Sequence, residues 1–275
     1  MGAVISKLLF QPPDPPSYKD NGDIIWLKTK EGVEIPSILL PYDGSDVVLI
    51  YSHGNATDLG QMIPYLELLR SRLKVNVFSY EYQGYGISKP KVKCTEKRCY
   101  SSIEAAVTFL STKKKFPTEN IIVFGCSLGS GPTIHITSKK AKFRAVILQS
   151  AFTSVIRIKF NTKKALPIDM FQNIDLISGV KCPVFFIHGK SDEVVPFLHG
   201  QKLCSMVEHK YDPLWIDYAG HNNIMEVLGV DLYIKRIRKF INYTKNYHNK
   251  TKDLQKSSSK REDNETNNGS SSKNV

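Results

Sequence analysis

Residues 121–131 read IIVFGCSLGSG, and this stretch decides the fold. Four large apolar residues, typical of a buried strand, run directly into a segment that holds glycines at 125, 129 and 131. Such a segment does not suit a helix interior, because glycine lowers helix stability by roughly 1 kcal/mol relative to alanine. The letters GCSLG match G-x-S-x-G, in which a serine lies in a strained turn between a strand and a helix. A helical pattern, PTIHITSKKA, follows at 132–141. We therefore predict a strand, a tight turn that carries Ser127, and a helix.

On both sides of this turn, short runs rich in β-branched residues alternate with longer helical patterns. The predicted strands lie at 24–29, 33–40, 47–52, 75–81, 120–126, 145–150, 183–188 and 213–218. The predicted helices lie at 59–72, 95–114, 128–140, 197–209 and 224–243. From residue 47 onward the strands are almost continuously apolar, which is typical of parallel strands covered on both faces, whereas the first two are typical of an antiparallel hairpin. We predict a mostly parallel eight-stranded sheet with helices on both faces.

Two later segments offer partners for Ser127. The segment FFIHGKSDEVVP (185–196) places Asp192 just beyond a predicted strand, and WIDYAGHNNI (215–224) places His221 in the loop after the next strand. The order serine, acid, histidine is that of α/β-hydrolases. Together with the turn at Ser127, this order predicts an α/β-hydrolase fold, and such hydrolases carry a lid that would here be a short one at about 152–181. A serine hydroxyl is a weak nucleophile until a base takes its proton. We expect His221 to act as that base and Asp192 to orient the imidazole and stabilise its cation.

Other residues of the same types admit different interpretations. Glu193 stays open as the acid in place of Asp192, while Asp217, in a predicted strand, fits a structural role. We interpret His188, which follows a buried strand, as a structural loop histidine. Three further histidines fall in predicted helices and fit packed or solvated positions: His135, His199 and His209.

A developing oxyanion needs hydrogen-bond donors as well. One is the backbone N–H of Leu128, the residue after the serine. The second is expected from the loop in VVLIYSHGNATDLGQ (47–61), where the N–H of Asn55 would point into the site and His53 would brace the loop.

Two interpretations of Cys126, the residue before the serine, stay open. It packs against the sheet, or its thiol makes the site sensitive to thiol reagents.

The two ends of the chain differ in composition from its middle. Residues 1–23 hold four prolines and predict an extended arm with little helix or strand of its own. Residues 244–275 are polar and cannot bury enough apolar surface to offset the entropy of ordering, so we predict a disordered tail. The expected folded domain is therefore 24–243.

The charge and the cysteines limit the partners. The formal net charge is +12, which suits solubility or attraction to an anionic membrane surface. No base-reading motif accompanies the charge, so we expect no nucleic-acid partner. The five cysteines show no CxxC pair, and we expect neither a metal nor a cofactor.

Five segments together resemble the α/β-hydrolase domain 17 family over about residues 8–242: SHGNATDLGQM, YEYQGYGIS, FGCSLGSGPT, HGKSDEVVPFLHG and AGHNNI. The resemblance implies a membrane-associated serine hydrolase that removes palmitate from S-acylated proteins. It also implies the roles of the site residues, namely Ser127, Asp192 and His221 as the triad and Asn55 and Leu128 as oxyanion donors.

The N-terminus departs from that family, which is anchored through palmitoylated cysteines near its start. Here the first cysteine is Cys94, and the chain begins MGAVISK. Gly2 and Ser6 match the N-myristoylation pattern. One myristoyl chain binds membranes only marginally, so we expect basic residues to add a second signal. The expected location is the cytoplasmic face of a membrane, with part of the protein in the cytosol.

Three functions stay open at this stage. The first is a membrane-tethered acyl-protein thioesterase, and the second is a lysophospholipase or broad carboxylesterase acting on lipid esters with the same triad. The third is a catalytically silent hydrolase fold that serves as a membrane scaffold. The intact set of serine, acid and histidine argues against the third.

Overall fold

The computed structural model describes residues 9–139, 142–159, 169–245 and 247. Gly2 and Ser6 of the predicted myristoylation pattern lie outside the described residues. So do nearly all of the predicted tail and residues 160–168 of the predicted lid. Within the described ranges, no helix is long and apolar enough to cross a bilayer.

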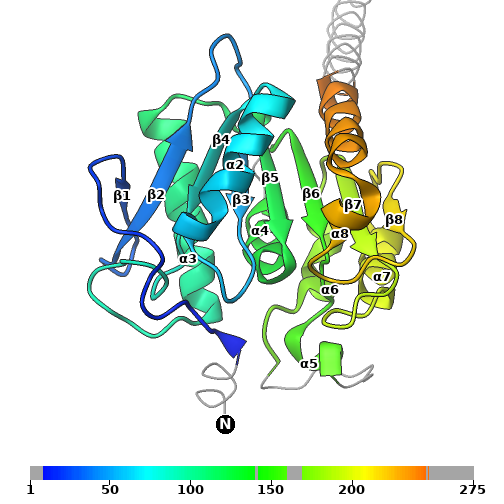
Figure 1. Ribbon diagram of the computed structural model, residues 1–275, viewed down its shortest axis with the longest axis horizontal. Helices are drawn as coiled ribbons and strands as arrows, with labels where there is room; N and C mark the ends of the chain where they lie inside the picture. The colour runs from blue at the N-terminus through cyan, green and yellow to red at the C-terminus, as the bar shows by residue number, and fades with distance from the viewer. Residues whose placement is uncertain (1–8, 140–141, 160–168, 246, 248–275) are drawn as a thin grey trace, which may run out of the picture.

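An eight-stranded sheet forms the centre of the molecule, in the order β1-β2-β4-β3-β5-β6-β7-β8 (Figure 1). The strands are β1 (Ile25–Lys28), β2 (Glu34–Leu40), β3 (Val48–Ser52), β4 (Asn76–Tyr80), β5 (Ile121–Cys126), β6 (Ala145–Gln149), β7 (Val184–Gly189) and β8 (Leu214–Ile216). The β1–β2 and β2–β4 pairs are antiparallel, and the other neighbours are parallel. Each predicted strand is present, with ends within two residues of those expected.

Helices cover both faces of the sheet (Figure 1). One face is covered by α2 (Leu59–Leu73), α8 (Ile224–Leu228) and a helix over 230–245. The other is covered by α3 (Glu96–Thr108), α4 (Ser130–Thr137) and α7 (Leu198–Met206). Two apolar cores result, one on each side, which explains why all five residues of β3 and of β4 are buried. The predicted α/β-hydrolase fold is confirmed.

Some helices differ from their predicted extents. The predicted helix 224–243 is interrupted at Gly229, whose φ of 84° lies in the left-handed region that favours glycine. Two short helices within the predicted lid, α5 (Val155–Lys159) and α6 (Asn173–Leu176), were not expected. Helices of four or five residues are too short to show a clear 3.6-residue periodicity.

The described part of the N-terminal arm packs against the domain. Phe10 is 7% exposed, and its ring meets Phe171 edge-on at 6.1 Å between centroids. Further along, the backbone N–H and the hydroxyl of Ser17 both donate to Asp58, the N-cap residue of α2. The arm is therefore attached to the loop that follows β3.

Candidate active site

Ser127 lies at the sharp turn between β5 and α4. Its φ is 50°, an unusual value for a residue with a side chain, and a short 3-10 turn over Ser127–Gly129 leads into α4. Glycine is needed on either side because the backbone folds so closely. A Cβ on Gly125 would lie 2.5 Å from the Gly129 carbonyl oxygen, and one on Gly129 would collide with the Ser52 carbonyl. These contacts explain the glycines of the G-x-S-x-G segment.

The three residues predicted to act together lie in one chain of hydrogen bonds. Asp192 Oδ2 is 2.8 Å from Nδ1 of His221, and His221 Nε2 is 3.0 Å from Ser127 Oγ. With Nδ1–H donating to the carboxylate, Nε2 is left to accept from the serine hydroxyl. The carboxylate that contacts His221 is that of Asp192, whereas Glu193 lies beside Gly220.

Asp192 is buried and held from several sides. Its Oδ1 accepts the backbone N–H groups of Val194 and Val195 at 3.0 and 2.7 Å. Burial alone would raise the pKa of this carboxyl, but hydrogen bonds from His188, His221 and the Val195 N–H outweigh burial and hold the pKa well below its usual range. Asp192 is therefore ionised at neutral pH, as a group that stabilises an imidazolium must be.

His188 reaches the same carboxylate, which the sequence interpretation missed. It lies in β7 with its side chain 1% exposed, and Nε2 is 2.9 Å from the Val195 carbonyl and 3.3 Å from Asp192 Oδ2. Since a carbonyl only accepts, Nε2 must carry the hydrogen. The four-residue spacing in HGKSD was the available signal. His188 is thus more than a loop histidine, because it contacts the predicted acid directly.

Asp217 and the three other histidines have partners outside the Ser127, His221 and Asp192 series. Asp217 is exposed and forms an ion pair with Lys190, in agreement with the structural interpretation. His135, in α4, stacks on Tyr100, and His199, in α7, contacts Thr153. His209 was predicted in a helix but lies beyond the end of α7 at Met206, beside Glu208.

The loop after β3 is braced on both sides. Asn55 Oδ1 accepts from the Gln11 N–H at 3.0 Å and from the Tyr85 hydroxyl at 2.6 Å, and its Nδ2 donates to the Leu9 carbonyl at 2.5 Å. The side-chain amide of Asn55 is therefore engaged with its neighbours. A contribution of this residue to an oxyanion hole, as predicted together with Leu128, would have to come from its backbone N–H.

His53 is fully buried under this loop. Its Nδ1 donates to the Gly54 carbonyl at 2.8 Å, Nε2 lies 3.2 Å from Glu81 Oε2, and the ring packs on Tyr82. Glu81 Oε1 also accepts from the backbone N–H of Leu59 at 2.8 Å. These contacts suit the predicted loop-bracing role.

A cavity of about 560 Å³ opens beside Ser127 and is also lined by Asn55, Cys126 and His221. This volume is in the usual range for small-ligand sites. Burial raises the pKa of the Cys126 thiol to about 11, while a hydrogen bond from Tyr51 opposes that rise. The thiol is therefore protonated at neutral pH, which favours the packing interpretation of Cys126 over the reactive one.

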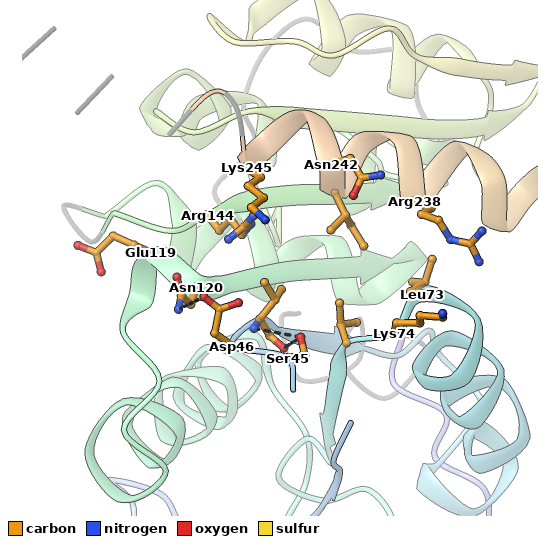
Figure 2. A pocket seen from close by; sticks show the side chains of 13 residues that line it. Ser45, Asp46, Leu73, Lys74, Glu119, Asn120, Arg144, Arg238, Asn242 and Lys245 are labelled. Carbon is orange, nitrogen blue, oxygen red and sulfur yellow. Dashed lines mark hydrogen bonds between the residues drawn. The ribbon is translucent and has the colours of Figure 1, made fainter. Parts of the chain in front are cut away.

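A second cavity, of about 600 Å³, lies at the opposite end of the sheet. Its lining includes Val47, Val75 and Asn120, each immediately before a parallel strand. Figure 2 shows that charged side chains of both signs surround it: Lys74, Arg144, Arg238, Lys245, Asp46 and Glu119. It is distant from Ser127, because parallel strands place their amino and carboxyl ends at opposite edges. Across the described ranges, no group of three or more histidine, cysteine, aspartate or glutamate side chains is arranged so that it could hold a metal ion.

Comparison with known proteins identifies relatives. The chain is 37% identical over 269 residues to human alpha/beta hydrolase domain-containing protein 17B, covering 87% of this chain and 91% of that protein. It is 42% identical over 200 residues to human alpha/beta hydrolase domain-containing protein 17C, covering 72% of this chain and 59% of that protein. No family model matches the chain.

Solved structures with the same fold include two esterases. The esterase Pf2001 of Pyrococcus furiosus superposes with a TM-score of 0.68 at 20% identity, covering 85% of this chain and 98% of the esterase. The esterase RhEst1 of Rhodococcus superposes with a TM-score of 0.62 at 15% identity, covering 80% and 98%. At these identities the likeness concerns the fold.

Proposed function

The chain belongs to the alpha/beta hydrolase domain-containing protein 17 family, and from that premise we propose that it is a serine hydrolase that removes acyl groups from S-acylated proteins. Membership of this family and the fold shared with esterases make it a hydrolase. The observation that carries the finer proposal is the hydrogen-bonded series Ser127, His221 and Asp192.

The proposed reaction has two halves. His221 Nε2 takes the Ser127 proton as Oγ attacks the thioester carbonyl, and the negative charge formed on the carbonyl oxygen is stabilised by the N–H groups of Leu128 and Asn55. Collapse of this intermediate breaks the C–S bond. His221 then protonates the departing cysteine sulfur, and the acyl group stays on Ser127.

In the second half, water replaces the cysteine. His221 takes a proton from water as the hydroxide attacks the acyl-enzyme, and it returns that proton to Ser127 Oγ when the ester bond breaks. The products are a free cysteine thiol and a fatty acid. Asp192 stays ionised throughout and stabilises the imidazolium, a role that its depressed pKa supports.

Labelling by a fluorophosphonate tests the nucleophile. We expect the probe to label the wild-type protein and not Ser127→Ala, with both variants showing the same melting temperature. Wild-type protein that is folded but unlabelled would favour the non-catalytic scaffold.

A substrate comparison tests the chemistry proposed above. We expect faster turnover of an S-palmitoyl peptide than of a lysophospholipid or a short carboxylic ester. A preference for the lysophospholipid would replace the thioesterase proposal with the lipid esterase.

We also propose attachment to the cytoplasmic face of a membrane through a myristoyl group on Gly2, which lies outside the described residues. The matching start of the chain and the net charge of +12 support this proposal. Gly2→Ala should move the protein from the membrane fraction to the cytosol. An unchanged distribution would contradict the anchor.

A further inference from the structure

The cavity beside Ser127 has an exposed mouth and a buried floor. Val194, at the mouth, is 48% exposed. At the floor, Tyr51 is 4% exposed and Tyr233 is completely buried. The lining therefore runs from an exposed residue to buried ones, and α2 and the helix over 230–245 both contribute to it.

Apolar and flexible side chains form part of its wall. Met62 comes from α2, and Ile224 and Met225 come from α8. Methionine side chains are unbranched and adapt to the shape of what they contact. Such a wall suits a flexible hydrocarbon.

The floor is made of polar groups that are paired with one another. The Tyr65 and Tyr233 hydroxyls are 2.8 Å apart, and the Tyr233 hydroxyl donates to Gln149 Oε1 at 2.7 Å. Gln149 Nε2 lies 3.7 Å from Cys126 Sγ. Because these groups have partners inside the protein, an apolar ligand can lie against them without the cost of an unpaired buried polar group. Tyr65 belongs to α2 and Tyr233 to the helix over 230–245, so their bond joins two helices that both line the cavity.

We propose that this cavity holds the unbranched acyl chain of the substrate, and that the Tyr65–Tyr233 pair at its floor limits the length of chain that fits. The inference rests on the proposed function, in which Ser127 attacks the acyl carbonyl. A cavity of about 560 Å³ cannot contain a protein, so the cysteine side of the thioester must stay outside. Only the acyl side is thin enough to enter.

The test is the chain-length profile of kcat/KM for p-nitrophenyl acetate, butyrate, octanoate and palmitate. Met62→Trp and Met225→Trp, both at partly exposed positions, fill the cavity from two sides. Each methylene that loses its buried place should cost about fourfold. We therefore expect the palmitate-to-acetate ratio of kcat/KM to fall at least tenfold in both variants.

Opening the floor should act in the opposite direction. In Tyr233→Ala the ratio of palmitate to octanoate turnover should rise severalfold, whereas in Tyr233→Phe, which keeps the ring, this ratio should not rise. Tyr243→Ala is the matched control, because Tyr243 lies on the same helix and packs on Tyr211 away from the cavity. If Tyr233→Ala does not fold, the two tryptophan variants decide.

Two results would overturn the acyl site. One is that the tryptophan variants lower kcat/KM by the same factor for every chain length. The other is that the fall in kcat/KM depends on the alcohol part of the ester, so that p-nitrophenyl and 4-methylumbelliferyl esters of the same acid are affected differently. Either result with normal fluorophosphonate labelling rejects the acyl site alone, whereas a wild-type protein that neither hydrolyses esters nor labels rejects the proposed function itself.

Discussion

Replacing His188 by leucine tests whether this buried histidine positions the proposed catalytic acid. The substitution keeps an apolar side chain in the core but removes the Nε2–H that faces Val195 O at 2.9 Å and Asp192 Oδ2 at 3.3 Å. Hydrogen bonds to charged groups contribute about 1.5–3 kcal/mol. The bond to Asp192 is long and shared, so we take the low end, about 1.5 kcal/mol, which corresponds to a change of slightly more than tenfold.

We expect His188→Leu to lower kcat on a soluble ester about tenfold, with KM within a factor of two, because the lost contact orients the acid and does not touch the substrate. One donor fewer also lets the pKa of Asp192 rise from its depressed value. Several hydrogen bonds to the carboxylate remain, so Asp192 stays ionised and the fall in kcat should appear at every pH of the assay. A merely structural histidine would lower the melting temperature and leave kcat unchanged.

The assay is a pH profile of kcat and kcat/KM from pH 4 to 9, combined with thermal melts. His188→Gln, whose amide N–H reaches the same direction, should recover part of the activity. His209→Leu is the matched control, since that histidine is partly exposed and lies beside Glu208. A folded His188→Leu protein with wild-type kcat would refute the positioning role.

Three further predictions follow from the same contacts. Gly129→Ala should lower the free energy of unfolding by about 3 kcal/mol and Tm by roughly 6–12 °C, because its Cβ would meet the Ser52 carbonyl; Gly54→Ala, whose Cβ would have 3.9 Å of clearance, should change Tm far less. Cys126 should resist N-ethylmaleimide in the native protein at pH 7, since its pKa is raised to about 11; mass spectrometry that finds rapid modification there would contradict this. Glu104 has its pKa lowered to about 2, because hydrogen bonds from Lys139, Lys30 and His135 outweigh the effect of burial. Because the pKa of Glu104 is lower in the folded protein, its ionised carboxylate stabilises the fold above pH 4.5, and this contribution is lost as the pH falls toward 2. Glu104→Gln should therefore lower the free energy of unfolding by about 1 kcal/mol at pH 7, after allowance for solvent screening, and by almost nothing at pH 2. Urea melts at the two pH values measure this, and an equal cost at both would contradict it.

The strands and the turn at Ser127 could be predicted because their causes are local. A parallel strand that is covered on both faces must be apolar at successive positions, as in β3 and β5. Glycine at 125 and 129 reflects the close approach of neighbouring backbone. The candidate site could be predicted as well. Ser127, Asp192 and His221 each follow the end of a strand, and the carboxyl ends of parallel strands meet at one edge of the sheet.

The remaining features depend on contacts between distant segments. Tyr65 and Tyr233 are 168 residues apart and meet only because two helices cross the same face of the sheet. The attachment of Gln11 to Asn55 likewise requires the arm to return to the loop after β3. No local pattern encodes such pairs, because a tyrosine or an asparagine has the same helix or turn preference whether or not its partner is present.

The amino-acid sequence by itself therefore determined the alternation of strands and helices, the sharp turn and the types of reactive side chain, because backbone conformation and burial depend on neighbours along the chain. Tertiary structure alone decided that His188 contacts Asp192, and that a cavity lined by Tyr65 and Tyr233 lies beside Ser127. Distances between side chains from different elements depend on how those elements pack, and packing is a property of the whole folded chain.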